Sequence, residues 1–184
     1  MKTAWTAAVV ACLAWASVFA AEGRYPKMLL KLSSSAFKPK GSIPKENACD
    51  GADVSPALSW SGAPKGTASF ALIMEDPDAP AGVWVHWVVY DIPAGEKGLA
   101  AAAPKADALP DGARHGLAWG VNAFDRVGYS GPCPPPGKPH RYVFTLFALD
   151  KKLNLPARKP KPELVKAMEG HILAQAELIG LYGR

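Results

Sequence analysis

Residues 83–92, Val-Trp-Val-His-Trp-Val-Val-Tyr-Asp-Ile, carry the strongest strand signal in the chain. Branched and aromatic residues fill the stretch, and Pro93 ends it. Strict alternation places Trp84, His86, Val88 and Tyr90 on one face. Both faces of residues 83–90 are apolar apart from His86, so this strand is expected to be buried on both sides.

Further runs on either side of this stretch also have the length and composition of strands. The clearest are residues 69–75 and 141–149, with shorter candidates at 28–32 and 58–60. The segment 95–115 has no clear period, and we expect it to form a surface excursion. Toward the C-terminus, residues 162–181 carry apolar side chains at near-helical spacing and predict an amphipathic helix packed on the sheet. The sequence therefore indicates a mainly β fold with one C-terminal α-helix.

Two carboxylates follow the apolar run 69–75, in the segment Asp76-Pro77-Asp78-Ala79-Pro80. In an extended chain, residues i and i+2 point the same way, so the two carboxylates are expected side by side at a strand end. The alternative is that aspartates beside proline only form a turn. His86 needs a partner if it is buried, and a carboxylate on a neighbouring strand would supply one. Its alternative is a hydrogen-bonded core histidine without a ligand.

The next strong strand begins with a third group of polar residues, His140-Arg141-Tyr142. His140 and Tyr142 share a face, and Arg141 points the other way. A pocket formed by these two residues with the aspartates and His86 would hold both charge signs. Anions would lie against imidazoles and backbone N–H groups near Gly131, and cations against the carboxylates. Such a mixture suits a small phosphorylated or zwitterionic ligand.

These motifs together resemble the phosphatidylethanolamine-binding protein family, also called Raf kinase inhibitor-like proteins. The resemblance is carried by residues 76–80, by His86-Trp87, by Gly131-Pro132 and by residues 140–142. The segments 55–60, 131–135 and 170–174 are similar to its bacterial, YbhB/YbcL-type branch. The family implies a sandwich of two antiparallel sheets with a C-terminal α-helix and short peripheral helices.

The resemblance also implies an anion or phospholipid-headgroup pocket, binding without catalysis, no cofactor, and a possible protein target. By motif position, the ligand-binding residues would be Asp76, Asp78, Pro80, Trp84, His86, Gly131, His140 and Tyr142. Only residues 81–85 separate the aspartate motif from His86, fewer than in eukaryotic members, so kinase regulation is not carried over with the pocket.

The N-terminus predicts export. Lys2 precedes an apolar run that ends in Val18-Phe19-Ala20, which is typical of a secretory signal peptide over residues 1–20. Residues 21–184 would then form a single domain that is periplasmic or secreted. Cys12 would leave with the signal, and the remaining pair, Cys49 and Cys133, is expected to form a disulfide in an oxidising compartment. Two buried free thiols are the alternative.

Charge and motif spacing weigh against other functions. The formal net charge of +5 is mild and has no aromatic-interleaved basic stripe, so nucleic acid is not expected as a partner. The apolar run of the leader is short for a membrane span, and no other apolar run nears the ~20 residues that a span needs. Metal-dependent hydrolysis lacks closely spaced ligands, and a hydrolase using Ser130 lacks a Gly-x-Ser-x-Gly elbow. A secreted protease or kinase inhibitor acting by protein contacts stays open as an alternative, as does the oligomeric state.

Overall fold

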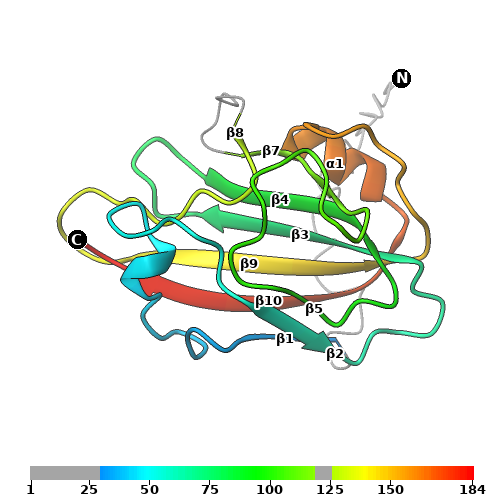
Figure 1. Ribbon diagram of the computed structural model, residues 1–184, viewed down its shortest axis with the longest axis horizontal. Coiled ribbons are helices and arrows are strands. Elements are labelled where there is room, and N and C mark those ends of the chain that lie inside the picture. The colour runs from blue at the N-terminus through cyan, green and yellow to red at the C-terminus, as the bar shows by residue number, and fades with distance from the viewer. Residues whose placement is uncertain (1–29, 119–125) are drawn as a thin grey trace, which may run out of the picture.

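The structure is a computed structural model that describes residues 30–118 and 126–184. The predicted signal peptide, residues 1–20, lies outside these ranges. The largest element is a five-stranded antiparallel sheet with the strand order β10-β9-β3-β4-β6, and its long strands run side by side across the molecule (Figure 1). The bounds are Ser69–Asp76 (β3), Trp84–Pro93 (β4), Arg114–His115 (β6), His140–Leu149 (β9) and Ile172–Tyr182 (β10).

A smaller antiparallel sheet with the order β1-β2-β5 covers one face of the large sheet. Its strands are Lys31–Ser34 (β1), Leu58–Ser61 (β2) and Gly98–Leu99 (β5). Leu117–Ala118 (β7) pairs with Arg126–Val127 (β8) in an antiparallel two-stranded sheet. The helical elements described are the 3-10 turn Lys45–Asn47 (η1) and the α-helix Lys161–Met168 (α1). The expected sandwich of antiparallel sheets with one α-helix is confirmed.

Apolar side chains pack on both faces of the large sheet, as the apolar composition of β3 and β4 predicts. On one face, Phe70, Leu72 and Trp87 pack with the small sheet through Trp60. On the other face, a smaller cluster packs against α1. Its members include Ala71, Ile73, Val88, Tyr90, Leu164 and Met168. Two-sided burial fixes the register of these strands, since a one-residue slip would exchange the two faces.

The alternation predicted for β4 is interrupted at His86. Met74 pairs with Trp87, but Glu75 pairs with Val85, so His86 is an extra residue in β4, a β-bulge. The bulge reverses the faces on either side of it. His86 therefore packs against Tyr142, with a ring-centroid distance of 5.2 Å, on the opposite face from Val88. The prediction that His86, Val88 and Tyr90 share a face is wrong for this reason.

The C-terminal helix is also shorter than the sequence predicts. It ends at Met168, Gly170 turns the chain with a φ of 76°, and residues 172–182 form β10 rather than further helix. Ala174, Ala176 and Leu178 alternate inward, and β10 pairs with β9 along almost its whole length. Because this pairing completes the large sheet, it outweighs the local helix propensity of the alanines.

Cys49 and Cys133 form the expected disulfide, which joins residues 84 positions apart. In the chain-entropy account, closing a loop of this length stabilises the fold by about 4 kcal/mol. Within residues 30–118 and 126–184, no helix has both the length and the apolar character needed to cross a membrane.

Candidate functional site

A cavity of about 200 Å³ opens where the end of β3 meets the start of β4 and the start of β9. Asp76 comes from β3, Trp84 and His86 come from β4, and His140 comes from β9. Three segments far apart in the sequence therefore meet at one edge of the sheet. The rest of the lining is small or apolar and consists of Ala79, Pro80, Ala81, Cys133, Pro134 and Pro135.

His86 is 2% exposed, and its Nδ1 lies 2.7 Å from the carbonyl oxygen of Ser130. A carbonyl only accepts hydrogen bonds, so this contact assigns the proton to Nδ1 and leaves Nε2 for a ligand. Burial lowers the pKa of His86, and the Ser130 carbonyl and the charge of Asp76 offset this in part. The free site therefore favours a neutral imidazole. The sequence predicts a carboxylate from a neighbouring strand as the partner of His86, but that carboxylate forms a hydrogen bond with another histidine.

That carboxylate is Asp76, which pairs with His140. The Asp76 Oδ2 lies 2.8 Å from His140 Nδ1, and the side chains are only 4% and 12% exposed. Asp76 Oδ1 accepts a second hydrogen bond, from the backbone N–H of Asp78 at 2.8 Å. Both oxygens of the carboxylate are therefore engaged. His140 is held by its Nδ1 and, like His86, keeps Nε2 for a ligand.

Asp78 does not point the same way as Asp76. The hydrogen bond from its N–H to Asp76 turns the chain at Pro77, so the extended geometry assumed for the pair is wrong. The Asp78 carboxylate instead accepts hydrogen bonds from the Arg141 guanidinium at 2.7 and 2.9 Å and from its backbone N–H. Arg141 holds the pKa of Asp78 well below its usual range. Asp78 lies outside the cavity lining.

Two other expected residues lie behind the cavity rather than in it. Tyr142 is fully buried beneath His86, and burial followed by the nearby charge of Asp76 raises the pKa of its phenol. Gly131 donates its N–H to Asp53 Oδ1 at 2.6 Å, so this group is already engaged. A Cβ at Gly131 would come within 2.3 Å of the Asn47 carbonyl oxygen, which explains why glycine fits here.

The structure thus brings five of the eight expected ligand residues to one cavity, namely Asp76, Pro80, Trp84, His86 and His140. The sequence reasoning missed the wall formed by Cys133, Pro134 and Pro135. The proline run indicates a segment outside the strand ladders, because proline lacks the N–H that a ladder needs, but it does not indicate which strand ends the segment covers. The contact from Ser130 to His86 is made by its carbonyl rather than its hydroxyl.

Comparisons with known proteins agree with this architecture. Residues 33–183 match the sequence profile of the phosphatidylethanolamine-binding protein family. The chain therefore belongs to this family. It is 48% identical over 155 residues to a UPF0098 protein of Methanothermobacter thermautotrophicus, which covers 84% of this chain and 99% of the relative. A UPF0098 protein of Aquifex aeolicus is 47% identical, covering 85% of this chain and 90% of the relative.

Two solved structures share the fold. A crystal structure of a Chlamydia trachomatis protein described as a putative phosphatidylethanolamine-binding protein homolog superposes with a TM-score of 0.76 at 38% identity, covering 85% of this chain and 98% of the other. Escherichia coli YbcL, described as a member of the mammalian family, superposes with a TM-score of 0.75 at 32% identity, covering 84% and 98%.

Proposed function

We propose that this protein binds a small phosphorylated or zwitterionic ligand in the cavity at the ends of β3, β4 and β9. The observation that carries the proposal is the pair of imidazoles, His86 and His140, each anchored through Nδ1 at the same cavity. Because both rings are held through Nδ1, both Nε2 atoms are left for a ligand in the same small cavity. The cavity volume of about 200 Å³ suits a headgroup rather than a larger organic ligand.

The lining matches both halves of a zwitterion. A neutral Nε2 accepts a hydrogen bond from a protonated phosphate or an ammonium, and a protonated imidazole donates one to an anion. The carboxylate of Asp76 and the indole of Trp84 are partners for a cationic group. Phosphatidylethanolamine, after which the family is named, carries both charges in its headgroup. We propose binding rather than catalysis.

Thermal unfolding with inorganic phosphate or O-phosphorylethanolamine tests the proposal. A ligand at 100 times its Kd adds about 2.7 kcal/mol to the stability of the folded state, which raises Tm by about 5–10 °C. We expect this rise in the wild type and its loss in His86→Ala. His171→Ala is the matched control, because His171 pairs with Asp150 away from the cavity and should keep the full shift. No shift in the wild type, or an unchanged shift in His86→Ala, would contradict the proposal.

We also propose that the protein is exported. The charged start and apolar run of residues 1–20 support this, and a disulfide is typical of proteins in oxidising compartments. Expression of the full chain in a bacterium, followed by fractionation and N-terminal sequencing, tests it. We expect the mature protein to begin at Ala21 and to lie outside the cytoplasm. An intact Met1 on cytoplasmic protein would contradict export.

A further inference from the structure

One wall of the cavity comes from the loop between Ser130 and β9, where Cys133, Pro134 and Pro135 line the space. Five of the residues from 131 to 139 are prolines, which have no N–H to donate. The loop therefore cannot be fixed by a strand ladder. Its position depends on the few contacts that it makes with other segments.

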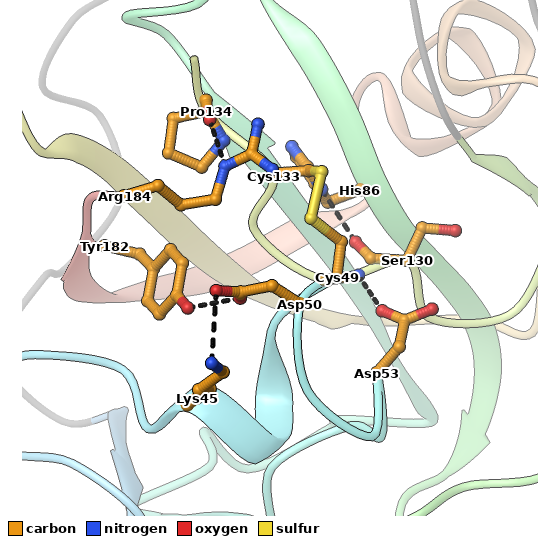
Figure 2. Close-up of a disulfide and its surroundings, with 11 residues drawn as sticks. Lys45, Cys49, Asp50, Asp53, His86, Ser130, Cys133, Pro134, Tyr182 and Arg184 are labelled. Atoms are coloured by element: carbon orange, nitrogen blue, oxygen red, sulfur yellow. Dashed lines mark hydrogen bonds and ion pairs between the residues drawn. A yellow bond between two sulfur atoms is a disulfide. The ribbon is translucent and has the colours of Figure 1, made fainter. Parts of the chain in front are cut away.

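Contacts of the loop with two other segments are drawn in Figure 2. The segment after η1 supplies the disulfide from Cys49 and a hydrogen bond from the Cys49 N–H to the Pro132 carbonyl at 3.0 Å. Arg184, which lies beyond the end of β10, donates its Nε–H to the Pro134 carbonyl at 2.7 Å. The disulfide at Cys133 is covalent, whereas the contacts at Pro132 and Pro134 are hydrogen bonds. The cavity wall is thus tied directly to a disulfide.

The two cysteine residues differ in their exposure to solvent. Cys49 is an exposed residue, whereas Cys133 is partly buried and faces the cavity. An exposed disulfide is open to thiol–disulfide exchange, and exposed bonds are the ones that regulatory chemistry uses. Because Cys49 is exposed and lies outside the cavity lining, we place the first attack of a reductant at Cys49 rather than at Cys133.

We propose that the Cys49–Cys133 disulfide is a redox-sensitive latch that holds the cavity wall in its ligand-binding position. Reduction releases residues 133–135 and lowers the affinity for the ligand. The proposal rests on the proposed function of the cavity and adds its regulation. The reductant is a dithiol, either a small molecule or a thiol–disulfide oxidoreductase.

The exchange proceeds in two balanced steps. A thiolate of the dithiol attacks Cys49 Sγ, forming a mixed disulfide, and the Sγ–Sγ bond breaks to release Cys133 as a thiolate that takes up a proton. The second thiolate of the reductant then attacks the other sulfur of the reductant, which is bonded to Cys49 in the mixed disulfide. Cys49 leaves as a thiolate and also takes up a proton. The protein gains two electrons and two protons, and the dithiol becomes a cyclic disulfide.

Calorimetric titration with inorganic phosphate compares the oxidised protein with protein reduced by dithiothreitol. If the wall holds its binding position in about one tenth of the reduced molecules, the apparent Kd rises about tenfold on reduction. By linkage, saturating phosphate must then favour the oxidised form to the same extent, which lowers the midpoint potential of the disulfide by about 30 mV. Far-UV circular dichroism checks that the reduced protein stays folded.

Cys49→Ser is the second variant, because it removes the bond and keeps the Cys133 side chain at the cavity. We expect its phosphate affinity to match that of the reduced wild type and to be insensitive to dithiothreitol. Equal affinities in oxidised wild type, reduced wild type and Cys49→Ser would overturn the latch. A reduced protein that loses its circular dichroism would also overturn it, since the bond would then hold the whole fold rather than the wall. Failure of the oxidised protein to bind phosphate would instead refute the proposed function.

Discussion

Asp76 and His140 should be energetically coupled, because a hydrogen bond of 2.8 Å joins the Asp76 carboxylate to the His140 imidazole and both side chains line the cavity. The two side chains are 4% and 12% exposed. Removing either side chain leaves the other, a buried polar group, without its hydrogen-bond partner. We therefore expect Asp76→Ala and His140→Ala each to lower the free energy of unfolding by about 2–3 kcal/mol.

The double variant should cost less than the sum of the two single variants. A hydrogen bond to a charged group contributes about 1.5–3 kcal/mol, so a coupling energy of about 2 kcal/mol is expected. Urea unfolding followed by tryptophan fluorescence, with the disulfide intact, measures all four proteins of the cycle.

A matched control lies one or two residues away on the same two segments. Asp78 and Arg141 form a closer-to-solvent pair, 31% and 54% exposed, and their cycle should give about 0.5 kcal/mol. Additive costs for Asp76 and His140, within about 0.5 kcal/mol, would refute the reasoning. So would a coupling no larger than that of the exposed pair.

Three further predictions concern the pH dependence conferred by His86 and Asp78 and the fit of Gly131 behind the cavity. The pKa of His86 is lowered in the free protein, and a bound anion favours its imidazolium form, so binding takes up a proton. The affinity for sulfate should therefore rise from pH 8 to pH 5.5. An affinity that stays flat or falls would count against His86 as an anion contact. Because Arg141 lowers the folded pKa of Asp78, this pair stabilises the protein above the unfolded pKa of about 3.9, and the contribution is lost as the pH falls through the folded pKa. Asp78→Asn should therefore lower Tm at pH 7 and flatten its decline in acid, and an unchanged acid profile would exclude the linkage. Gly131→Ala places a Cβ 2.3 Å from the Asn47 carbonyl and should cost about 1–3 kcal/mol by urea unfolding, whereas a neutral result would show that the backbone can shift there.

The central strands follow from composition and alternation alone, because burial on both faces leaves a clear record in residues 69–76 and 141–149. The sequence of β10 does not show that this segment pairs with β9. Its alanines and Glu177 also suit a helix, and only the pairing with β9 decides between the two structures. The need for glycine at position 180 also comes from tertiary packing, since a Cβ there would lie 2.5 Å from the Ile43 side chain.

The candidate site could be predicted in its membership more than in its contacts. Strand ends that meet at one sheet edge bring Asp76, His86 and His140 together, as their positions beside apolar runs suggest. The bulge at His86 adds one residue without any local marker, so its orientation could not be predicted from a period of two. The same holds for the exchange of partners, in which Asp76 pairs with His140 and His86 with a carbonyl.

The chain has four histidines, which allows a direct test of the central claim that His86 and His140 share one ligand cavity. Imidazole nitrogen and carbon signals can be followed by NMR during a phosphate titration at constant pH. The signals of His86 and His140 should move together with one Kd, while those of His115 and His171, which do not line the cavity, stay in place. Unchanged signals from His86 and His140 at saturating phosphate, or equal changes at all four histidines, would contradict the account.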